Sequence, residues 1–253
     1  MSVSKSLAAI RERMAEAALR SGRSPSDITL VAVSKTFEAD AVLEAIAASQ
    51  IDFGENRVEE ALDKMASVKA QHSSPVRWHL IGHVQSRKAK DAAGRFALIH
   101  SVDSLRLASK LNAACQANGA TQDILLECNA SGEASKDGFA LADWQTNRIV
   151  LDHFTREVEE IIALPHIRVR GLMTIAPIVD TADGARPTFA SLRALRDALR
   201  ERFPQVTWDH LSMGMTDDFE IAIAEGATMI RIGRAIFGFR LPLPKGEGRG
   251  EGR

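Results

Sequence analysis

The stretch Leu30-Val31-Ala32-Val33-Ser34-Lys35-Thr36 joins four consecutive apolar residues to three polar ones, one of them a lysine. A short apolar run with such a boundary is typical of a strand that is buried on both faces of a parallel sheet. Lys35 would then lie at the carboxyl end of the strand, next to the apolar core. Because desolvation disfavours the ammonium form, a lysine there tends toward the neutral amine, which forms Schiff bases with aldehydes and ketones. The alternative is a strand-end lysine whose ammonium group simply reaches water.

Seven more short apolar runs follow, and segments of helical periodicity separate them. We expect strands at 28–33, 51–53, 76–81, 98–102, 124–128, 167–173, 210–212 and 229–232. Helices are expected before the first strand and between the others, among them 58–70, 87–93, 219–224 and one that Asp103 caps. Alternating β and α units over about 240 residues indicate an α/β protein with a single (β/α)8 TIM barrel. An open doubly wound sheet is the alternative, but no Gly-x-Gly-x-x-Gly follows the first strand.

The pattern shows no break that would separate two domains. We expect one barrel over residues 1–243, without a second domain. The glycine-rich, charged segment 244–253 is expected to be a disordered tail.

Composition excludes several classes of function. The chain of 253 residues has a formal net charge of -1, so a nucleic-acid partner is not expected, because phosphate neutralisation requires clustered basic residues. No apolar run reaches the roughly 18–20 residues of a membrane span, and no signal-peptide pattern opens the chain. Cys115 and Cys128 are expected to be buried thiols rather than a disulfide framework. These features predict a cytoplasmic protein, and we expect a monomer.

In a TIM barrel the active site forms at the carboxyl ends of the strands. The residues expected there share polar or conformationally special side chains, and they are Lys35, Asn56, His79, Lys136, Met173, Ser212, Gly214, Arg231 and Gly233. The segment 212–218 and the turn around Gly233 resemble a phosphate site, because glycine turns and helix starts expose backbone N–H groups. The alternative is that these glycines only make turns. No metal-ligand spacing is present. A lysine beside a phosphate cradle suits a phosphorylated aldehyde, either pyridoxal 5′-phosphate (PLP) or a phosphosugar in a Schiff-base aldolase.

Six segments in order resemble the YggS/PROSC family, the pyridoxal phosphate homeostasis proteins. They are Ala32-Val33-Ser34-Lys35-Thr36, Phe53-Gly54-Glu55-Asn56, Trp78-His79-Leu80-Ile81-Gly82 with Gln85, Arg170-Gly171-Leu172-Met173, Leu211-Ser212-Met213-Gly214-Met215-Thr216-Asp217-Asp218, and Arg231-Ile232-Gly233 through Phe237-Gly238. The segments span nearly the whole folded part, and their joint occurrence is highly specific.

The resemblance implies a barrel like the N-terminal domain of alanine racemase, with PLP as cofactor. By position in the motifs, Lys35 matches the lysine that holds PLP as a Schiff base, and Arg231 matches the arginine that faces the pyridine nitrogen. Ser212, Gly214 and Gly233 match the phosphate cradle. The remaining matches line the pocket or lie near it, and they are Asn56, His79, Met173 and the second lysine, Lys136. For His79 the alternative is a histidine of the core or rim whose hydrogen bonds are satisfied within the protein.

This chain departs from the family pattern at two positions. Arg234 stands where the family often has Ser or Thr, so a backbone N–H of Arg234 or its guanidinium would replace a hydroxyl at the phosphate. Arg87 stands where the family commonly has Asn.

The resemblance implies a PLP-binding protein of PLP and amino-acid homeostasis, without efficient turnover. Its expected partners are PLP, free amino acids and recipient apo-enzymes. The alternatives are a PLP-dependent amino-acid racemase or Schiff-base lyase, and a regulatory protein that holds PLP only for stability. A racemase of the related barrel type uses a tyrosine as its second base, and this chain contains no tyrosine.

Overall fold

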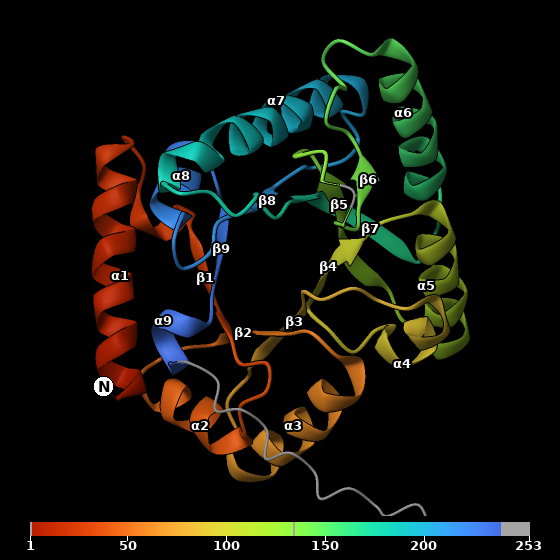
Figure 1. The fold of residues 1–253 in the computed structure, drawn as a ribbon. Helices are drawn as coiled ribbons and strands as arrows, with labels where there is room; N and C mark the ends of the chain where they lie inside the picture. The colour runs from red at the N-terminus through yellow and green to blue at the C-terminus, as the bar shows by residue number, and fades with distance from the viewer. Residues whose placement is uncertain (1, 134, 239–253) are drawn as a thin grey trace, which may run out of the picture.

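The strands close into a ring of parallel neighbours (Figure 1). The computed structural model describes residues 2–133 and 135–238. The strand order is β4-β3-β2-β1-β9-β8-β7-β5, and β4 also pairs with β5, which closes the barrel. The strands are β1 (Thr29–Val33), β2 (Asp52–Glu55), β3 (Arg77–Leu80), β4 (Leu98–Val102), β5 (Gln122–Asn129), β6 (Phe139–Ala140), β7 (Ile167–Met173), β8 (His210–Ser212) and β9 (Met229–Ile232). The predicted single (β/α)8 TIM barrel is therefore confirmed.

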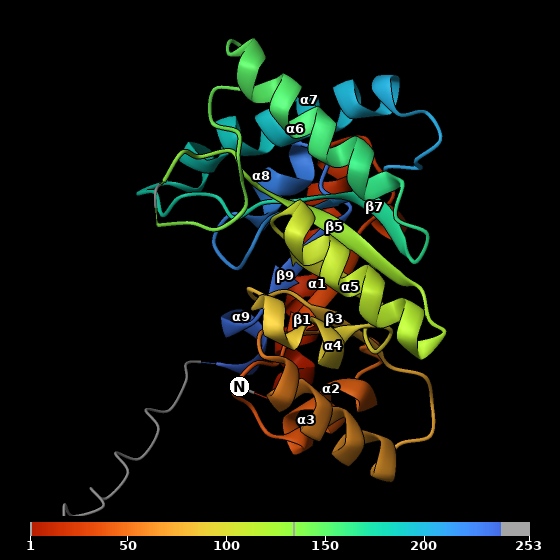
Figure 2. The same ribbon diagram turned by 90° about the vertical axis from the view of Figure 1, so that its right-hand side faces the viewer.

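The helices surround this ring, as the two perpendicular views show (Figures 1 and 2). They are α1 (Val3–Arg20), α2 (Ala39–Ala47), α3 (Val58–Gln71), α4 (Ala89–Ala92), α5 (Leu105–Asn118), α6 (Arg148–Ile162), α7 (Arg186–Arg202), α8 (Phe219–Ala224) and α9 (Arg234–Phe237). Three short 3-10 helices complete the connections: η1 (Pro25–Asp27), η2 (Ser86–Lys88) and η3 (Ala182–Ala185).

Three local features differ from the sequence-based expectations. The two-residue strand β6 was not expected; it pairs with β5 outside the ring. The helix expected over 87–93 begins as the 3-10 helix η2 and continues only briefly as α4. The assignment of Asp103 as a helix cap is wrong. The Ser104 hydroxyl accepts the N–H of Leu107 (3.3 Å), and Asp103 accepts the hydroxyl proton of Ser104 (2.7 Å).

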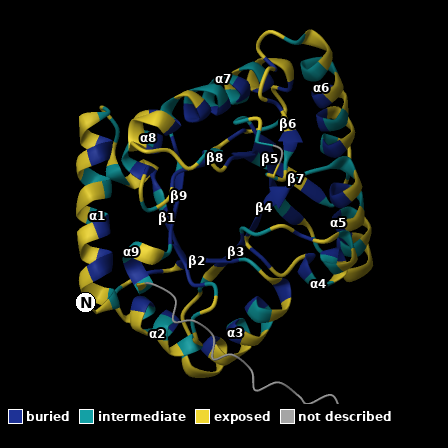
Figure 3. Ribbon diagram, in the orientation of Figure 1, coloured by how far each residue is buried: buried dark blue, intermediate teal, exposed yellow. Residues whose placement is uncertain are grey.

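The buried residues form two clusters, and the ring of strands is buried along most of its length (Figure 3). Alternate strand residues pack against the helices in a large cluster that includes Leu80, Leu126 and Ile232. Residues one position away point into the barrel, because successive side chains leave opposite faces of a strand. Four of these interior residues form a small separate cluster: Leu98, Leu125, Met173 and Met229. Much of the remaining interior is polar, and this polar interior lies beneath the site.

Gly171 explains one of the motifs found in the sequence. Its φ of +150° lies where side chains are disfavoured, and a Cβ there would lie 1.9 Å from the carbonyl oxygen of His210 on β8. Only glycine allows β7 and β8 to approach this closely.

Both cysteines are free thiols and are buried, as expected. The segment 244–253, for which a disordered tail was predicted, lies outside the described residues. Within the described part of the chain, no helix combines the length and apolar character that crossing a membrane requires.

Candidate functional site

A cavity of about 520 Å³ opens at the carboxyl ends of the barrel strands. Six of the residues predicted for the site line this cavity: Lys35, Asn56, Lys136, Arg231, Gly233 and Arg234. They lie at or just after the ends of β1, β2 and β9 and in the segment between β5 and β6, so residues separated by up to about 200 positions line one cavity. The other four, His79, Met173, Ser212 and Gly214, are not among the lining residues.

Lys35 follows β1 in a tight turn. A lysine of α3, Lys64, makes hydrogen bonds to this turn. The Lys64 ammonium donates to Glu55 Oε1 (2.7 Å) and to the carbonyl of Ser34 (2.8 Å). The Ser34 hydroxyl donates to the same Glu55 oxygen (2.7 Å). The next residue, Thr36, has a φ of +68°, a left-handed conformation that is unusual for a β-branched side chain. Lys35 therefore projects from a turn whose backbone is fixed on both sides.

The group that fixes this turn is a buried ion pair. Glu55 and Lys64 expose 0% and 5% of their side chains. Burial raises the pKa of Glu55, although the hydrogen bonds from Lys64 and Ser34 oppose the shift. Glu60, one turn before Lys64 on α3, accepts the backbone N–H of Thr36 (2.5 Å). Sequence analysis did not predict the ion pair between Glu55 and Lys64. The signal for it was that Lys64 lies on a helix face whose other buried residues are apolar.

Arg231 brings a buried guanidinium to the floor of the cavity. Its Nη1 donates to the hydroxyl of Ser212 (2.6 Å), and its Nη2 donates to the carbonyl of Thr174 (2.9 Å). Burial lowers the pKa of Arg231 to about 10, against the opposing charges of Glu127 and Asp218. The group is therefore a cation at neutral pH. Two of its five N–H groups bond Ser212 and Thr174, so the other N–H groups remain as possible donors to a ligand in the cavity.

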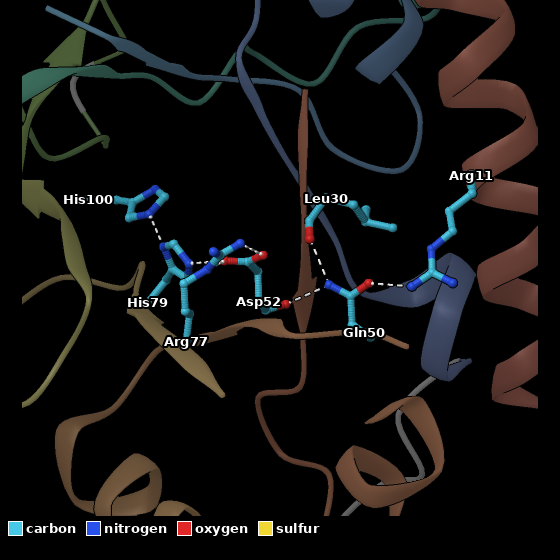
Figure 4. A network of polar contacts seen from close by, with 7 residues as sticks. All are labelled: Arg11, Leu30, Gln50, Asp52, Arg77, His79 and His100. Atoms are coloured by element: carbon cyan, nitrogen blue, oxygen red, sulfur yellow. Dashed lines mark hydrogen bonds and ion pairs between the residues drawn. The ribbon is translucent and has the colours of Figure 1, made fainter. Parts of the chain in front are cut away.

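A chain of hydrogen bonds runs from Arg231 through the barrel interior. Ser212 Oγ lies 2.8 Å from Nδ1 of His100, and Nε2 of His100 lies 3.0 Å from Nδ1 of His79. His79 Nε2 lies 3.0 Å from Asp52 Oδ1, and Asp52 also accepts from the guanidinium of Arg77 (Figure 4). His79 thus lies beneath the cavity, not on its wall.

The two ends of this chain limit where its protons lie. Arg231 can only donate, and Asp52 can only accept when it is ionised. Burial would raise the pKa of Asp52, but the hydrogen bonds from His79 and Arg77 outweigh it and hold that pKa below its usual range. Burial keeps His100 neutral by lowering its pKa well below normal. A neutral His100 donates from one ring nitrogen only, so its Nδ1 accepts the hydroxyl proton of Ser212 when its Nε2 donates to His79.

Ser212, which was predicted for the phosphate cradle, bonds within this chain. Its hydroxyl oxygen accepts from Arg231 and lies 2.8 Å from Nδ1 of His100. Met173 likewise contributes to the interior apolar cluster under the site. Gly214, with a φ of +94°, lets the chain pass close to α8, where a Cβ would lie 2.6 Å from the Cβ of Ala222. These residues support the cavity from beneath.

The two remaining cations of the cavity wall have carboxylate partners. Arg234 contacts Asp217 through Nη2, at 2.5 and 2.6 Å. The Lys136 ammonium pairs with Glu133 and donates to the carbonyl of Ile175 (3.1 Å). Both cations stand at the rim, where a phosphate could draw them inward. The other departure from the family pattern, Arg87, lies outside this cavity, where its Nε donates to Gln85 (2.9 Å).

Sequence analysis missed an acidic side of the cavity. Glu127 of β5 lines the cavity together with Asp137 and His83. Burial, together with Asp103 and Asp137, raises the pKa of Glu127 to about 7. The signal for this carboxyl was its place in the strand: Leu125, Glu127 and Asn129 alternate, and therefore share the interior face. In the described residues, no group of three or more His, Cys, Asp or Glu side chains could hold a metal ion.

Known proteins are similar to this chain over nearly its whole length. Residues 6–241 match the family model described as "Alanine racemase, N-terminal domain". A pyridoxal phosphate homeostasis protein of Escherichia coli is 42% identical over 239 residues, which are 94% of this chain and 97% of that protein. The chain belongs to the family of pyridoxal phosphate homeostasis proteins.

Solved structures of this family show the same barrel. The structure of PipY from Synechococcus elongatus with PLP bound is 39% identical, with a TM-score of 0.74, and the match covers 90% of this chain and all of that one. Alanine racemase from Corynebacterium glutamicum shares the fold at 15% identity, with a TM-score of 0.65, over 92% of this chain and 62% of that one. The predicted family and the alanine-racemase type of barrel are both confirmed.

Proposed function

We propose that this protein binds PLP covalently through Lys35 and serves PLP and amino-acid homeostasis as a holder of the cofactor. The observation that carries the proposal is the juxtaposition of Lys35 with the buried guanidinium of Arg231 in one cavity. When bound, PLP supplies an aldehyde that forms a Schiff base with a primary amine. The membership of the chain in the homeostasis family and the PLP-bound structure of PipY support the assignment.

The residues of the cavity fit the three functional groups of PLP. The Lys35 amine suits the aldehyde, and the Arg231 guanidinium suits the pyridine nitrogen as a hydrogen-bond donor. A cation in that position disfavours protonation of the ring nitrogen, and an unprotonated ring withdraws electrons weakly. The phosphate would lie at the turn of Gly233 and Arg234. At that turn a Cβ on Gly233 would lie 3.2 Å from the carbonyl oxygen of Val33, so the backbone is closely packed.

The remaining predicted residues have supporting roles in this proposal. Asn56 and Lys136 form the wall beside the cofactor. His79 and Ser212 hold Arg231 in position through the interior chain, while Met173 and Gly214 shape the floor. We propose that the barrel over residues 1–243 acts in the cytoplasm as a monomer, and that free amino acids and recipient apo-enzymes are its partners.

The site of attachment can be tested directly. Reduction of the PLP-loaded protein with borohydride, followed by peptide mass mapping, should place the pyridoxyl group on Lys35. Lys35→Ala should remove this modification, whereas Lys136→Ala should leave it in place. A pyridoxyl group found only on Lys136 of the unchanged protein would overturn the assignment.

A protein that only holds PLP differs from an amino-acid racemase because it does not turn over amino acids. The racemases of related fold use a tyrosine as their second base, and the sequence has none. Loss of a general base costs about 10²–10⁴ in rate. We expect L-alanine in deuterated buffer to undergo neither rapid inversion nor rapid exchange at Cα. Exchange at about 1 per second or faster would be an enzymatic rate and would contradict the holder function.

A further inference from the structure

One carboxyl group of the cavity lacks a partner. Glu127 exposes 7% of its surface, and its Oε2 atom accepts no hydrogen bond from the described residues. An unpaired buried carboxylate is costly, because water no longer solvates the charge. Glu127 is one of the residues that line the cavity. The wall of the cavity therefore contains a carboxyl group with one buried oxygen that has no partner.

Glu127 stands opposite Lys35. Lys35 follows β1, and Glu127 belongs to β5. Around the closed ring, β5 is the fourth strand from β1 in either direction (Figure 1). The cavity thus has an amine on one wall and a carboxyl on the opposite wall.

The charges around Glu127 favour a cationic ligand. Asp103, at the end of β4, and Asp137, in the segment before β6, both act on the carboxyl with negative charge. His83 lies between these two aspartates, at 3.2 and 3.4 Å. Arg231 on β9 is a cation whose charge counteracts the effect of the two aspartates on Glu127. Its Nη1 and Nη2 also donate to Ser212 and to the carbonyl of Thr174.

Lys35 and Lys136 line the same cavity. The ammonium of Lys136 is held by Glu133 and by the carbonyl of Ile175. Near β4 and β5 the carboxylates around Glu127 therefore outnumber the cations, whereas Lys35, Arg231 and Arg234 line the rest of the cavity.

We propose that Glu127 binds the ammonium group of a small primary amine inside the cavity, with Asp137 at the rim completing the negative environment. A primary ammonium has three donors and one positive charge, which match the carboxyl of Glu127 and the carboxylates around it. A metal ion fits less well, since the described residues contain no group of three potential ligands. The inference deepens the proposed function, because an amine held across from Lys35 is the class of molecule that competes with a lysine for an aldehyde. The ammonium site itself does not depend on PLP.

The test is a calorimetric titration of the PLP-free protein with putrescine, a diamine, at pH 8. We expect binding that weakens roughly tenfold or more in Glu127→Gln, which keeps the shape but removes the charge. Glu225→Gln is the matched control, because Glu225 is an equally buried glutamate (8% exposed) that pairs with Arg186 and Arg193 and does not line the cavity. It should bind putrescine like the unchanged protein. The uncharged analogue 1,4-butanediol should not bind.

A pH series on the unchanged protein gives a second measure that requires no variant. Putrescine keeps its charges between pH 5.5 and 8.5, as simple alkylammonium groups with pKa values of about 10 do. Its affinity should therefore rise as Glu127 ionises, with a midpoint near the pKa of about 7 of this carboxyl. Absence of binding to the unchanged protein, or equal binding in Glu127→Gln, would overturn the inference. Failure of PLP attachment would appear separately, in the borohydride experiment.

Discussion

Two glutamates are buried near the mouth of the barrel, and they differ in what neutralises them. Glu55, behind the turn of Lys35, has the ammonium of Lys64 and the hydroxyl of Ser34 on one oxygen. Glu127, on the opposite wall, has two aspartates nearby and an oxygen without a partner. Burial raises the pKa of both carboxyls. Each also has an unpaired Oε2, but only Glu127 lines the cavity.

The comparison separates two uses of a buried charge. Glu55 has its cation within the fold, so it fixes a backbone turn and is complete without a ligand. The carboxylate of Glu127 has no cation paired with it, and this lowers the stability of the fold. The same carboxylate is therefore available to bind a ligand. Three substitutions test this distinction.

The largest effect is expected from removing the internal cation of Glu55. Lys64→Met leaves Glu55 buried without its partner, and breaking such a pair typically costs about 3–5 kcal/mol. Urea unfolding at pH 7 measures the change. The double variant Lys64→Met/Glu55→Gln should recover part of the loss, because the unpaired charge is then gone. If Lys64→Met cost less than about 1 kcal/mol, as exposed pairs do, the pair would not support the Lys35 turn.

The next effect concerns pH and Glu127. A glutamate in an unfolded chain has a pKa of about 4.3, whereas burial and the neighbouring aspartates raise the pKa of Glu127 to about 7 in the folded protein. The folded state thus binds this proton more tightly. The resulting stability is fully present below about pH 4 and is lost as the pH rises through 7.

Glu127→Gln should remove this pH-dependent loss. The difference in unfolding free energy between the variant and the unchanged protein should therefore shift in favour of the variant between pH 5 and pH 8, by up to roughly 3 kcal/mol. Urea unfolding at several pH values measures it. A constant difference across this range would show that Glu127 titrates normally.

The smallest effect is expected at Thr36, in the turn that Glu55 and its neighbours hold. Its φ of +68° costs a β-branched residue about 1–3 kcal/mol, which Thr36→Gly would relieve. Glycine also gains freedom in the unfolded chain, worth roughly 0.5–1 kcal/mol in the opposite direction. The net change in unfolding free energy should therefore be a gain between about 0 and 2.5 kcal/mol. A loss above about 2 kcal/mol would mean that the threonine side chain itself stabilises the turn.

Much of the fold and part of the site follow from local sequence. The strands at 98–102, 167–173, 210–212 and 229–232 were predicted with the bounds that the structure has, because short apolar runs and turn residues mark them. Lys35 and Arg231 were predicted for the site because they stand at strand ends, which meet at one end of a barrel, and both line the cavity there.

What was missed depends on pairing between distant segments. Glu55 with Lys64 joins a strand to a helix, and Glu127 becomes notable only once Asp137 and the closed ring surround it. His79 was predicted at the pocket, but its partner His100 gained significance only from the packing of β3 against β4. The two-residue strand β6 is too short to produce a periodic signal.

His100 of the interior chain also links folding to the release of a proton. In an unfolded chain a histidine has a pKa of about 6.5, so below that pH it carries a positive charge. Burial lowers the pKa of His100 well below this value, so it enters the folded barrel neutral. Closing the ring in mildly acidic solution therefore expels a proton from the barrel interior into the solvent. Acidification in that range works against closure through the same residue that holds Ser212 beneath Arg231.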